Sequence, residues 1–356
     1  MDAIPNISVV VATYNRAETL RETLRHLEAQ RIVPESFEVI VVDDGSTDDT
    51  RATVEAAQIR SRFALQYLYH ANHGPGYTQN CGIRAARAPI ILLIADDIFL
   101  APNALSAHLT CHTRNAASGV AVLGRVLQSP ALTHSVFLSK WEPWPLGDLP
   151  DGKLMPYHMF WACNISFKRD FMLEYGMFRD EPGRAGAAAH EDVELGYRLH
   201  QHGLQVIYGR EALGYHHHVE TLKGTLQRSY QRGLNWHDFR RRVPQPEIDI
   251  TYRAYTLATL LVRGREISGP RHRYLLDADK RLPRLAARYL LRRLMFNRLT
   301  VNLLWLPLFA AAERVHWLAS CVRGNLYRGV IVYFFLKGCD DGRSRYRTSP
   351  QSQLSG

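Results

Sequence analysis

The segment from Ile90 to Asp97, I-I-L-L-I-A-D-D, strongly constrains how this chain can fold. Its six aliphatic or small residues have the length and composition of a β-strand buried on both faces. Asp96 and Asp97 follow where the strand would end, and burying carboxylates is costly without a positive partner. In open α/β sheets, ligands bind beyond the carboxyl ends of the strands. The segment therefore indicates either a divalent cation with a phosphate-bearing ligand, or an Asp96 that caps a turn.

Two further apolar runs end in polar residues in the same way. Ile7 to Ala12 leads into Thr13-Tyr14-Asn15, and Phe37 to Val42 leads into Asp43-Asp44. An amphipathic helix, Ala17 to Gln30, separates the two runs. Strands that alternate with helices predict a doubly wound, mostly parallel α/β sheet. We expect the ligand to lie where the polar residues after these strands meet.

Acidic and histidine residues recur near residues 190 and 216. Glu191 and Asp192 open a predicted helix, Val193 to His202. Capping and the helix dipole explain Glu191, whereas for Asp192 the position alone is equally compatible with a functional role. In His216-His217-His218, an extended backbone would point His216 and His218 to one face and His217 to the other.

Two loops are candidates for substrate contacts. Trp141 to Pro156 is rich in Pro, Gly and Trp, and loops of that length in compact domains tend to be functional, although ordinary surface decoration is equally compatible. Gly183 to Ala189 is small and flexible, which suits a mobile loop.

The cysteines and the apolar runs bear on localisation. Five cysteines without C-x-x-C pairing argue against a disulfide framework and a zinc site, and they favour a reducing cytosol. The N-terminus has no signal-peptide pattern. The longest uncharged apolar run, Leu299 to Ala312, has 14 residues, which is shorter than the roughly 20 that a spanning helix needs. We therefore expect a cytoplasmic protein.

Most of the net charge of +10 lies in the C-terminal third. Between Arg263 and Arg298, eleven Lys or Arg face three acids, an excess of eight. Arg281, Arg284, Arg288 and Arg292 follow helical spacing, with apolar residues beside them. A basic amphipathic helix beside short apolar runs suits an anionic membrane surface at the inner face of the cell membrane, and packing on the N-terminal α/β domain or a second subunit is equally compatible. No nucleic-acid recognition motif accompanies the charge, so we expect no nucleic-acid partner.

Six stretches, in order, resemble the family 2 inverting glycosyltransferases of the GT-A fold. They are S-V-V-V-A-T-Y-N-R from Ser8, V-I-V-V-D-D-G-S-T-D-D-T from Val39, N-H-G-P-G-Y-T-Q-N from Asn72, I-L-L-I-A-D-D-I from Ile91, C-N-I-S from Cys163, and H-E-D-V-E-L-G-Y-R-L from His190. The resemblance covers about residues 5 to 235. It implies a GT-A catalytic domain over residues 1–225, to which we add a helical basic region over 226–340 and, from its composition, a disordered tail over 341–356.

The resemblance also implies roles for individual residues. Asp97 would ligate Mn²⁺ or Mg²⁺ as part of the D-x-D signature, with His216 or His218 as a further metal or diphosphate contact, and Asp192 would be the general base. The nucleotide of a nucleotide-sugar donor, UDP by default, would contact Thr13, Tyr14, Asn15, Asp43, Asp44, Asn80 and Asp96, the first five at the nucleoside. The donor and acceptor neighbourhood would include Trp161, Asn164, Glu191 and Arg232. The acceptor would be a glycan or a lipid-linked precursor.

The chain departs from the family pattern at two positions. Ala95 stands where the first acid of the D-x-D signature is expected, and Gln79 stands where the family often has Arg. Ala95 keeps open a second interpretation, a catalytically impaired nucleotide-sugar-binding subunit of a polysaccharide assembly complex.

Overall fold

A computed structural model describes residues 4–132, 135–141, 146, 149–179, 190–256 and 278–347. The chain divides into two compact units, Met1–Thr133 with Trp144–Val219, and His134–Pro143 with Glu220–Gly356. The boundary expected at residue 225 thus falls inside the second unit, which also takes His134–Pro143 from the expected catalytic domain.

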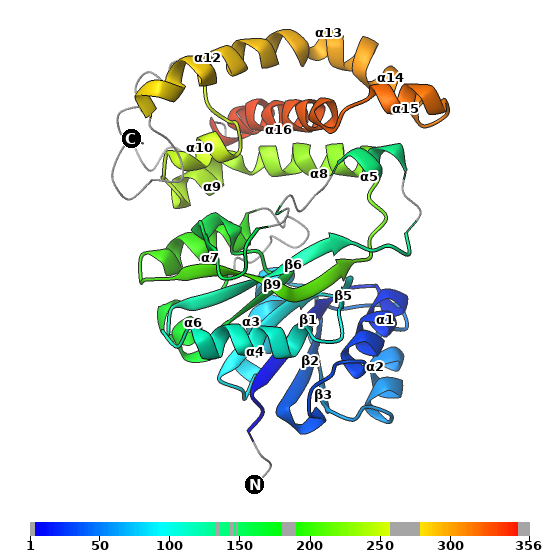
Figure 1. Cartoon of the computed structure of the whole chain (residues 1–356), viewed down its shortest axis with the longest axis vertical. Coiled ribbons are helices and arrows are strands. Elements are labelled where there is room, and N and C mark those ends of the chain that lie inside the picture. The colour runs from blue at the N-terminus through cyan, green and yellow to red at the C-terminus, as the bar shows by residue number, and fades with distance from the viewer. Residues whose placement is uncertain are drawn as a thin grey trace. The chain divides into compact units, whose positions relative to one another are not determined.

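The first unit is built on one mixed sheet (Figure 1), whose strand order over the described residues is β3-β2-β1-β4-β8-β6-β9-β5, with β7 beside β9. The strands are β1 Ile7–Thr13, β2 Phe37–Asp43, β3 Ala64–Tyr69, β4 Ile90–Ala95, β5 Ile98–Leu100, β6 Val120–Gln128, β7 Leu154–Met155, β8 Asn164–Lys168 and β9 Gln205–His216. The strands β3, β2, β1 and β4 are parallel, and β8 runs antiparallel to β4. The predicted α/β sheet is confirmed, and the carboxyl ends of β1, β2 and β4 meet at one edge.

Helices cover both faces of this sheet because the strand side chains alternate between two cores. Val10 packs into one core while Val9 and Val11 pack into the other, as a period of two requires. The helices are α1 Ala17–Glu28, α2 Thr50–Gln58, α3 Pro75–Ala85, α4 Ala104–Arg114, α6 Arg169–Tyr175 and α7 Glu191–His200. α1, α2 and α4 supply residues to the core of Val9, and α3, α6 and α7 supply residues to the core of Val10.

The second unit is helical, as expected. Its helices are α5 Val136–Lys140, α8 Leu222–Leu234, α9 Trp236–Arg242, α10 Glu247–Thr251, α12 Ala278–Met295, α13 Arg298–Thr300, the π-helix η5 Val301–Trp305, α14 Leu306–Ala312, α15 His316–Cys321 and α16 Gly324–Arg347. α16 lies along α8 (Figure 1), and any Cβ at Gly338 would meet the Tyr230 carbonyl oxygen and lie 3.0 Å from the Gly233 Cα.

The disordered tail expected from residue 341 is wrong as far as Arg347, because α16 continues to that residue. Gly342 packs against the Leu234 backbone, so α8 gives the end of α16 a surface to pack on. Residues 348–356 lie outside the described residues.

The apolar run from Leu299 to Ala312 is helical throughout. Among the described helices, none is by itself both long and apolar enough to cross a membrane. Pro283–Met295 and Arg298–Ala312 satisfy that test only as a pair, and the pair is bent by 51°.

Two buried histidines of α4 contact side chains of β8. His108 Nδ1 and His112 Nε2 lie 2.8 and 2.9 Å from the Ser166 hydroxyl oxygen, and His108 Nε2 lies 3.1 Å from Asn164 Oδ1. Burial lowers the pKa of His108 to about 4. Burial, with His108 and Lys168 nearby, lowers the pKa of His112 to about 3. Both imidazoles are therefore neutral in the folded protein at pH 7.

These histidines predict acid destabilisation. The unfolded chain takes up their protons below pH of about 6.5 while the folded protein does not, so stability is present above that pH and is lost as pH falls toward 4. We expect each histidine to lower the free energy of unfolding by about 2 kcal/mol between pH 6.5 and 4.5. In urea unfolding, the free energy of unfolding of His112→Gln should fall less between pH 6.5 and 4.5 than that of the wild type. His202→Gln, at an exposed histidine, should lose as much as the wild type does. Equal slopes for His112→Gln and the wild type would contradict the account.

Candidate functional site

Asp96 and Asp97 lie buried at the end of β4, with Arg16 and Thr13 beside them. Arg16 Nη1 donates to Asp96 Oδ1 and to Asp97 Oδ2, both at 2.8 Å. The Thr13 hydroxyl donates to Asp96 Oδ2 at 2.8 Å. β1 and β4 are paired in parallel, which brings the residues that follow each strand to the same edge. The positive partner that the sequence required for these acids is therefore a side chain of the loop after β1.

The carboxylate pair and Arg16 influence each other's protonation. Burial raises the pKa of Asp96 to about 6, with Asp97 adding to the effect and Arg16 opposing it. Burial disfavours the charged form of Arg16, but Asp96 and Asp97 outweigh it and raise the pKa of the guanidinium. Arg16 therefore stays charged. Sequence reasoning missed this residue, although it stands directly after Thr13-Tyr14-Asn15.

Pairing of β5 with the end of β9 brings two histidines to Asp97. Ile98 lies opposite His216, and the His217 backbone N–H donates to the Asp97 carbonyl oxygen at 2.7 Å. Asp97 Oδ2 lies 3.7 Å from His216 Nε2 and 4.0 Å from His218 Nδ1. His217 points elsewhere and stacks on Phe99 at 4.7 Å between ring centres. The predicted alternation along His216-His217-His218 is confirmed.

The chemistry of this group suits a divalent metal, although the group is not assembled as a metal site. One carboxylate oxygen and two imidazole nitrogens form a ligand set that Mn²⁺ accepts. Within the described ranges, no three His, Cys, Asp or Glu side chains are spaced to hold an ion. Arg16 instead contacts the same Oδ2 of Asp97 that faces the histidines.

The loops after β1 and β2 are held together by side-chain bonds. Asn15 has a left-handed backbone (φ 53°), and its Oδ1 accepts from the Thr47 N–H at 2.8 Å. The Ala17 N–H donates to Asp48 at 3.0 Å. Asn15 thus orders the two loops, while the neighbouring Tyr14 ring is 47% exposed and free to meet a ligand.

Asp43 and Asp44 hold the backbone of neighbouring loops. Asp43 accepts from the Ser46 N–H at 2.8 Å and from the Tyr67 hydroxyl at 2.6 Å. Asp44 accepts from the His73 N–H at 2.7 Å and the Gly74 N–H at 3.0 Å. Both carboxylates are buried, so each shapes the edge where a nucleoside was expected.

Two predicted site residues have structural partners instead. The buried Asn80 donates to the Phe178 carbonyl oxygen at 2.8 Å and accepts from the Phe178 N–H at 3.0 Å. The buried Asn164 donates to the Ala212 carbonyl oxygen at 3.0 Å. Both amides bridge segments of the fold, and a ligand contact for either side chain stays a prediction.

Asp192 lies half-buried in the first turn of α7. The Cys163 thiol lies close to both: burial raises the pKa of this thiol, and the carboxylates of Asp192 and Asp97 raise it further. Cys163 itself adjoins the end of β4, since its carbonyl oxygen accepts from the Ala95 N–H at 3.2 Å. The two predicted functional acids thus share an electrostatic influence on one thiol, which adjoins the end of β4.

The remaining predicted residues have the following neighbours in the structure. Glu191 approaches the start of α3, where a Cβ at Gly76 would come within 3.3 Å of its Oε2. Trp161 is partly buried against the core of Val10. Arg232 belongs to the second unit, where its guanidinium lies 5.7 Å from the Tyr252 ring centre.

The expected loops are only partly described. Residues 142–145, 147 and 148 of the first loop, and all of Gly183 to Ala189, lie outside the described residues. In the described part of the first loop, Leu154–Met155 forms β7 against β9.

Comparison with known proteins agrees with this geometry. Residues 8–175 match the model of glycosyl transferase family 2. Validoxylamine A glucosyltransferase of Streptomyces hygroscopicus subsp. limoneus is 34% identical over 237 residues, which cover 59% of this chain and 51% of that protein. Glucosyl-dolichyl phosphate glucuronosyltransferase of Haloferax volcanii is 28% identical over 217 residues, covering 58% and 67%.

A solved structure shares the fold. Mannosyltransferase PcManGT from Pyrobaculum calidifontis, in complex with GDP-Man and Mn²⁺, aligns with a TM-score of 0.57 at 16% identity, over 98% of this chain and 89% of that one. The resemblance to family 2 glycosyltransferases and the GT-A fold are confirmed, and the stretch that matches the family model, residues 8–175, lies mostly in the first unit. The chain spans about half the length of the first relative.

The Arg16 bridge predicts a measurable coupling. Removing one partner of a fully buried ion pair costs about 3–5 kcal/mol, but Arg16 is 41% exposed, so we expect Arg16→Gln to lower the free energy of unfolding by about 1–2 kcal/mol. The free energy of unfolding lost on Arg16→Gln should be smaller when Asp96 is already replaced by Asn, which a double-mutant cycle at pH 7 measures. Arg25→Gln is the matched control at an exposed pair with Glu22. An Arg16 effect no larger than that of Arg25 would contradict the bridge.

Proposed function

We propose that the protein is an inverting glycosyltransferase that moves a sugar from a nucleoside-diphosphate sugar, UDP by default, to a hydroxyl of a glycan or lipid-linked acceptor. The observation that carries this proposal is the approach of His216 and His218 to Asp97 at the end of the sheet. The influence of both Asp192 and Asp97 on the Cys163 thiol supports placing the general base near that group. An anionic donor with a divalent cation suits that group of side chains.

The donor would bind over the loops after β1 and β2. The exposed Tyr14 ring offers a stacking surface for the base, and Thr13 and Asp96 lie beside it. Asp43, Asp44 and Asn15 hold these loops in place by the bonds described above, so their contribution to nucleoside binding is mainly to position the backbone. Arg16 offers a guanidinium, which pairs well with phosphate oxygens.

Asp97, with His216 and His218, would hold Mn²⁺ or Mg²⁺. A divalent ion there stabilises negative charge on the leaving diphosphate. For Asp97 Oδ2 to become a ligand, Arg16 must release it, and a diphosphate is an alternative partner for the freed guanidinium.

Asp192 would act as the general base. The acceptor hydroxyl attacks the anomeric carbon from the face opposite the diphosphate, and the bond to the diphosphate oxygen breaks as the new oxygen–carbon bond forms. The hydroxyl proton passes to the Asp192 carboxylate, a contribution of about 10² to 10⁴ in rate. Its half-buried place at the start of α7 supports this role.

A lipid-linked acceptor at the cytoplasmic face of the cell membrane is the form of the proposal that we favour. The Haloferax relative is named for a dolichyl-phosphate substrate. All five cysteines of this chain are free, which fits a reducing compartment.

A second candidate function is a nucleotide-sugar-binding subunit without catalysis. Ala95 replaces an acid of the expected signature, and Arg16 already forms an ion pair with each of the two acids that remain. Hydrolysis of a nucleotide-sugar panel with Mn²⁺ separates the two: slow release of nucleoside diphosphate supports the enzyme, and binding without release supports the subunit.

We expect Asp192→Asn to lower turnover by about 10² to 10⁴ with donor affinity nearly unchanged, because the amide cannot accept the proton. Donor hydrolysis or transfer gives the rate, and calorimetry gives the affinity. Asp170→Asn is the matched control, an exposed first-turn acid of another helix, α6. Full turnover in Asp192→Asn would reject the assignment.

The histidine alternation yields a metal test. Mn²⁺ with UDP should raise the melting temperature of the wild type, and this shift should be lost in Asp97→Asn and reduced in His218→Gln. His217→Gln should keep the full shift, because His217 faces Phe99 rather than Asp97. A shift that persists in Asp97→Asn would remove Asp97 from the metal site.

A further inference from the structure

The second unit turns a row of large apolar side chains toward solvent. Leu290, Leu291 and Leu294 of α12, Leu299 of α13, Leu303 and Leu304 of η5, and Trp317 of α15 are each 50–75% exposed. We call these seven residues the leucine face. Soluble proteins rarely expose so many neighbouring apolar side chains without a partner.

The buried side of the same helices shows that this exposure is not a general lack of packing. Leu285 of α12 packs in a cluster with Tyr255, and Val301 of η5 is fully buried in the core of the second unit. Figure 1 shows α12 and α13 following one another in an arc over α16. The inward positions are filled, so the leucine face points away from the core.

Arginines flank the leucine face rather than forming a face of their own. Arg284, Arg288, Arg293 and Arg298 are exposed. Arg292, expected among the outward arginines, turns inward: its guanidinium lies 5.3 Å from the Tyr255 ring centre and donates to the Arg253 carbonyl oxygen at 2.6 Å. The side chain of Arg281 lies outside the described residues. The outward surface of α12 is therefore apolar in its centre and cationic at its margins.

The positive charge of the segment from Lys280 to Ala312 favours an anionic partner. From Lys280 to Ala312 the chain has seven Lys or Arg and no Asp or Glu. Apolar side chains with cations at their margins match a bilayer whose headgroups are anionic. We infer that the leucine face docks the protein on an anionic membrane, with the leucines at the acyl boundary and the arginines among the headgroups. This surface is independent of the glycosyl transfer proposed above.

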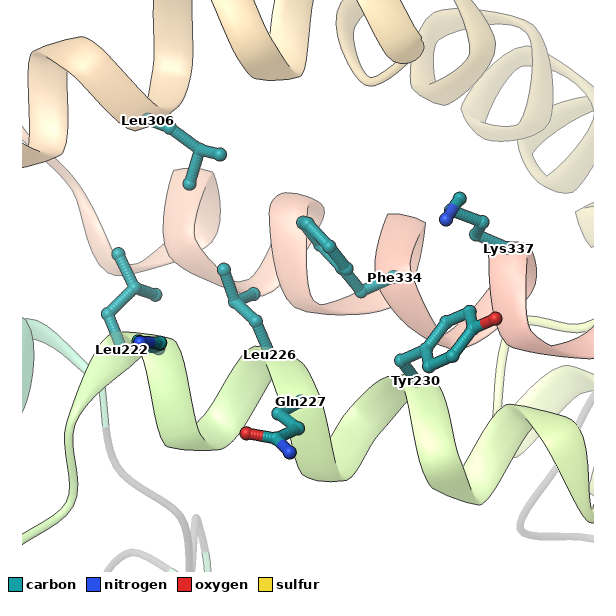
Figure 2. A pocket seen from close by; sticks show the side chains of 8 residues that line it. Leu222, Leu226, Gln227, Tyr230, Leu306, Phe334 and Lys337 are labelled. Carbon is teal, nitrogen blue, oxygen red and sulfur yellow. The ribbon is translucent and has the colours of Figure 1, made fainter.

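An apolar cavity in the same unit agrees with a lipid partner. Its volume is about 440 Å³, and its lining includes Leu222, Leu226, Leu306 and Phe334. Figure 2 shows Tyr230 and Lys337 close together along this lining, and the Lys337 amine lies 5.0 Å from the Tyr230 ring centre. An alkyl chain is the ligand that fits such a lining.

Vesicle flotation of the full chain, without donor or metal, tests the inference. The wild type should float with vesicles of phosphatidylcholine and phosphatidylglycerol, and far less with phosphatidylcholine alone. Leu290→Gln/Leu294→Gln should weaken partitioning by at least about tenfold, and Arg284→Gln/Arg288→Gln by about fivefold per arginine. Ile59→Gln, at an isoleucine that is 87% exposed in the first unit, is the matched control and should float as the wild type does.

Fluorescence provides a local readout of the same event. Vesicles should shift the tryptophan emission of the wild type to the blue, and Trp317→Phe should remove part of that shift. Far-ultraviolet circular dichroism checks that each variant is folded.

Three results would overturn the inference. They are no flotation of the folded wild type, equal flotation with neutral and anionic vesicles, and a wild-type dimer that binds no vesicles and becomes monomeric in Leu290→Gln/Leu294→Gln. The last result would assign the leucine face to a second copy of the chain. Donor hydrolysis measured in solution is unaffected by any of these outcomes, so failure of the docking inference and failure of the proposed function remain distinguishable.

Discussion

The buried carboxylates of Asp96 and Asp97 need a positive partner, and several parts of the first unit contribute to the arrangement that supplies one. Parallel pairing of β1 with β4 carries Arg16 to within 2.8 Å of both acids. Asn15 and Asp48 fix the loop that carries Arg16 against the loop after β2. The antiparallel pairing of β5 with β9 then brings two imidazoles to within 4.0 Å of Asp97 Oδ2, the oxygen that Arg16 also contacts. Because charges are costly to leave unpaired in a buried place, these contacts fix the side chains at this edge of the sheet, where we propose that the donor binds.

In our account, either of two cations can pair with Asp97: the Arg16 guanidinium or a divalent metal ion. In the structure Arg16 neutralises Asp97, whereas in the proposed working state a divalent ion does so and Arg16 contacts phosphate. The histidines face the same carboxylate oxygen as Arg16, so the two states compete for one atom. Competition of this kind would link metal binding to donor binding. A metal ion on Asp97 would free Arg16 for the diphosphate, and a diphosphate on Arg16 would free Asp97 for the metal ion. The missing acid at Ala95 is then less damaging than the sequence suggests, because two imidazole nitrogens offer alternative ligands.

Local patterns predicted the first half of the fold well. The expected strands at Ile7 and Phe37 each extend one residue further than predicted, and the strand from Ile90 to Ala95 has the predicted bounds. Alternation along β9 also placed His216 and His218 correctly. What local patterns did not predict are contacts between residues distant in the chain. Asn80 bonds Phe178, Asn164 bonds Ala212, and Arg16 bonds two acids that are 80 and 81 residues away. Residues 134–143 joined the second unit and α12 turned its leucines outward for the same reason, because tertiary packing and not local sequence decides which helical face is buried.

The central claim is that one sugar nucleotide and one divalent ion bind where Asp97 and Asp192 meet. Anomalous scattering at the manganese edge, from crystals grown with Mn²⁺ and UDP, tests it most directly. The account predicts a single strong peak within coordination distance of Asp97 Oδ2, with an imidazole of His216 or His218 beside it. It also predicts that Arg16 contacts the diphosphate and that the Asp192 carboxylate faces the bound UDP. A peak away from Asp97, or bound UDP with Asp192 turned away from it, would contradict the account.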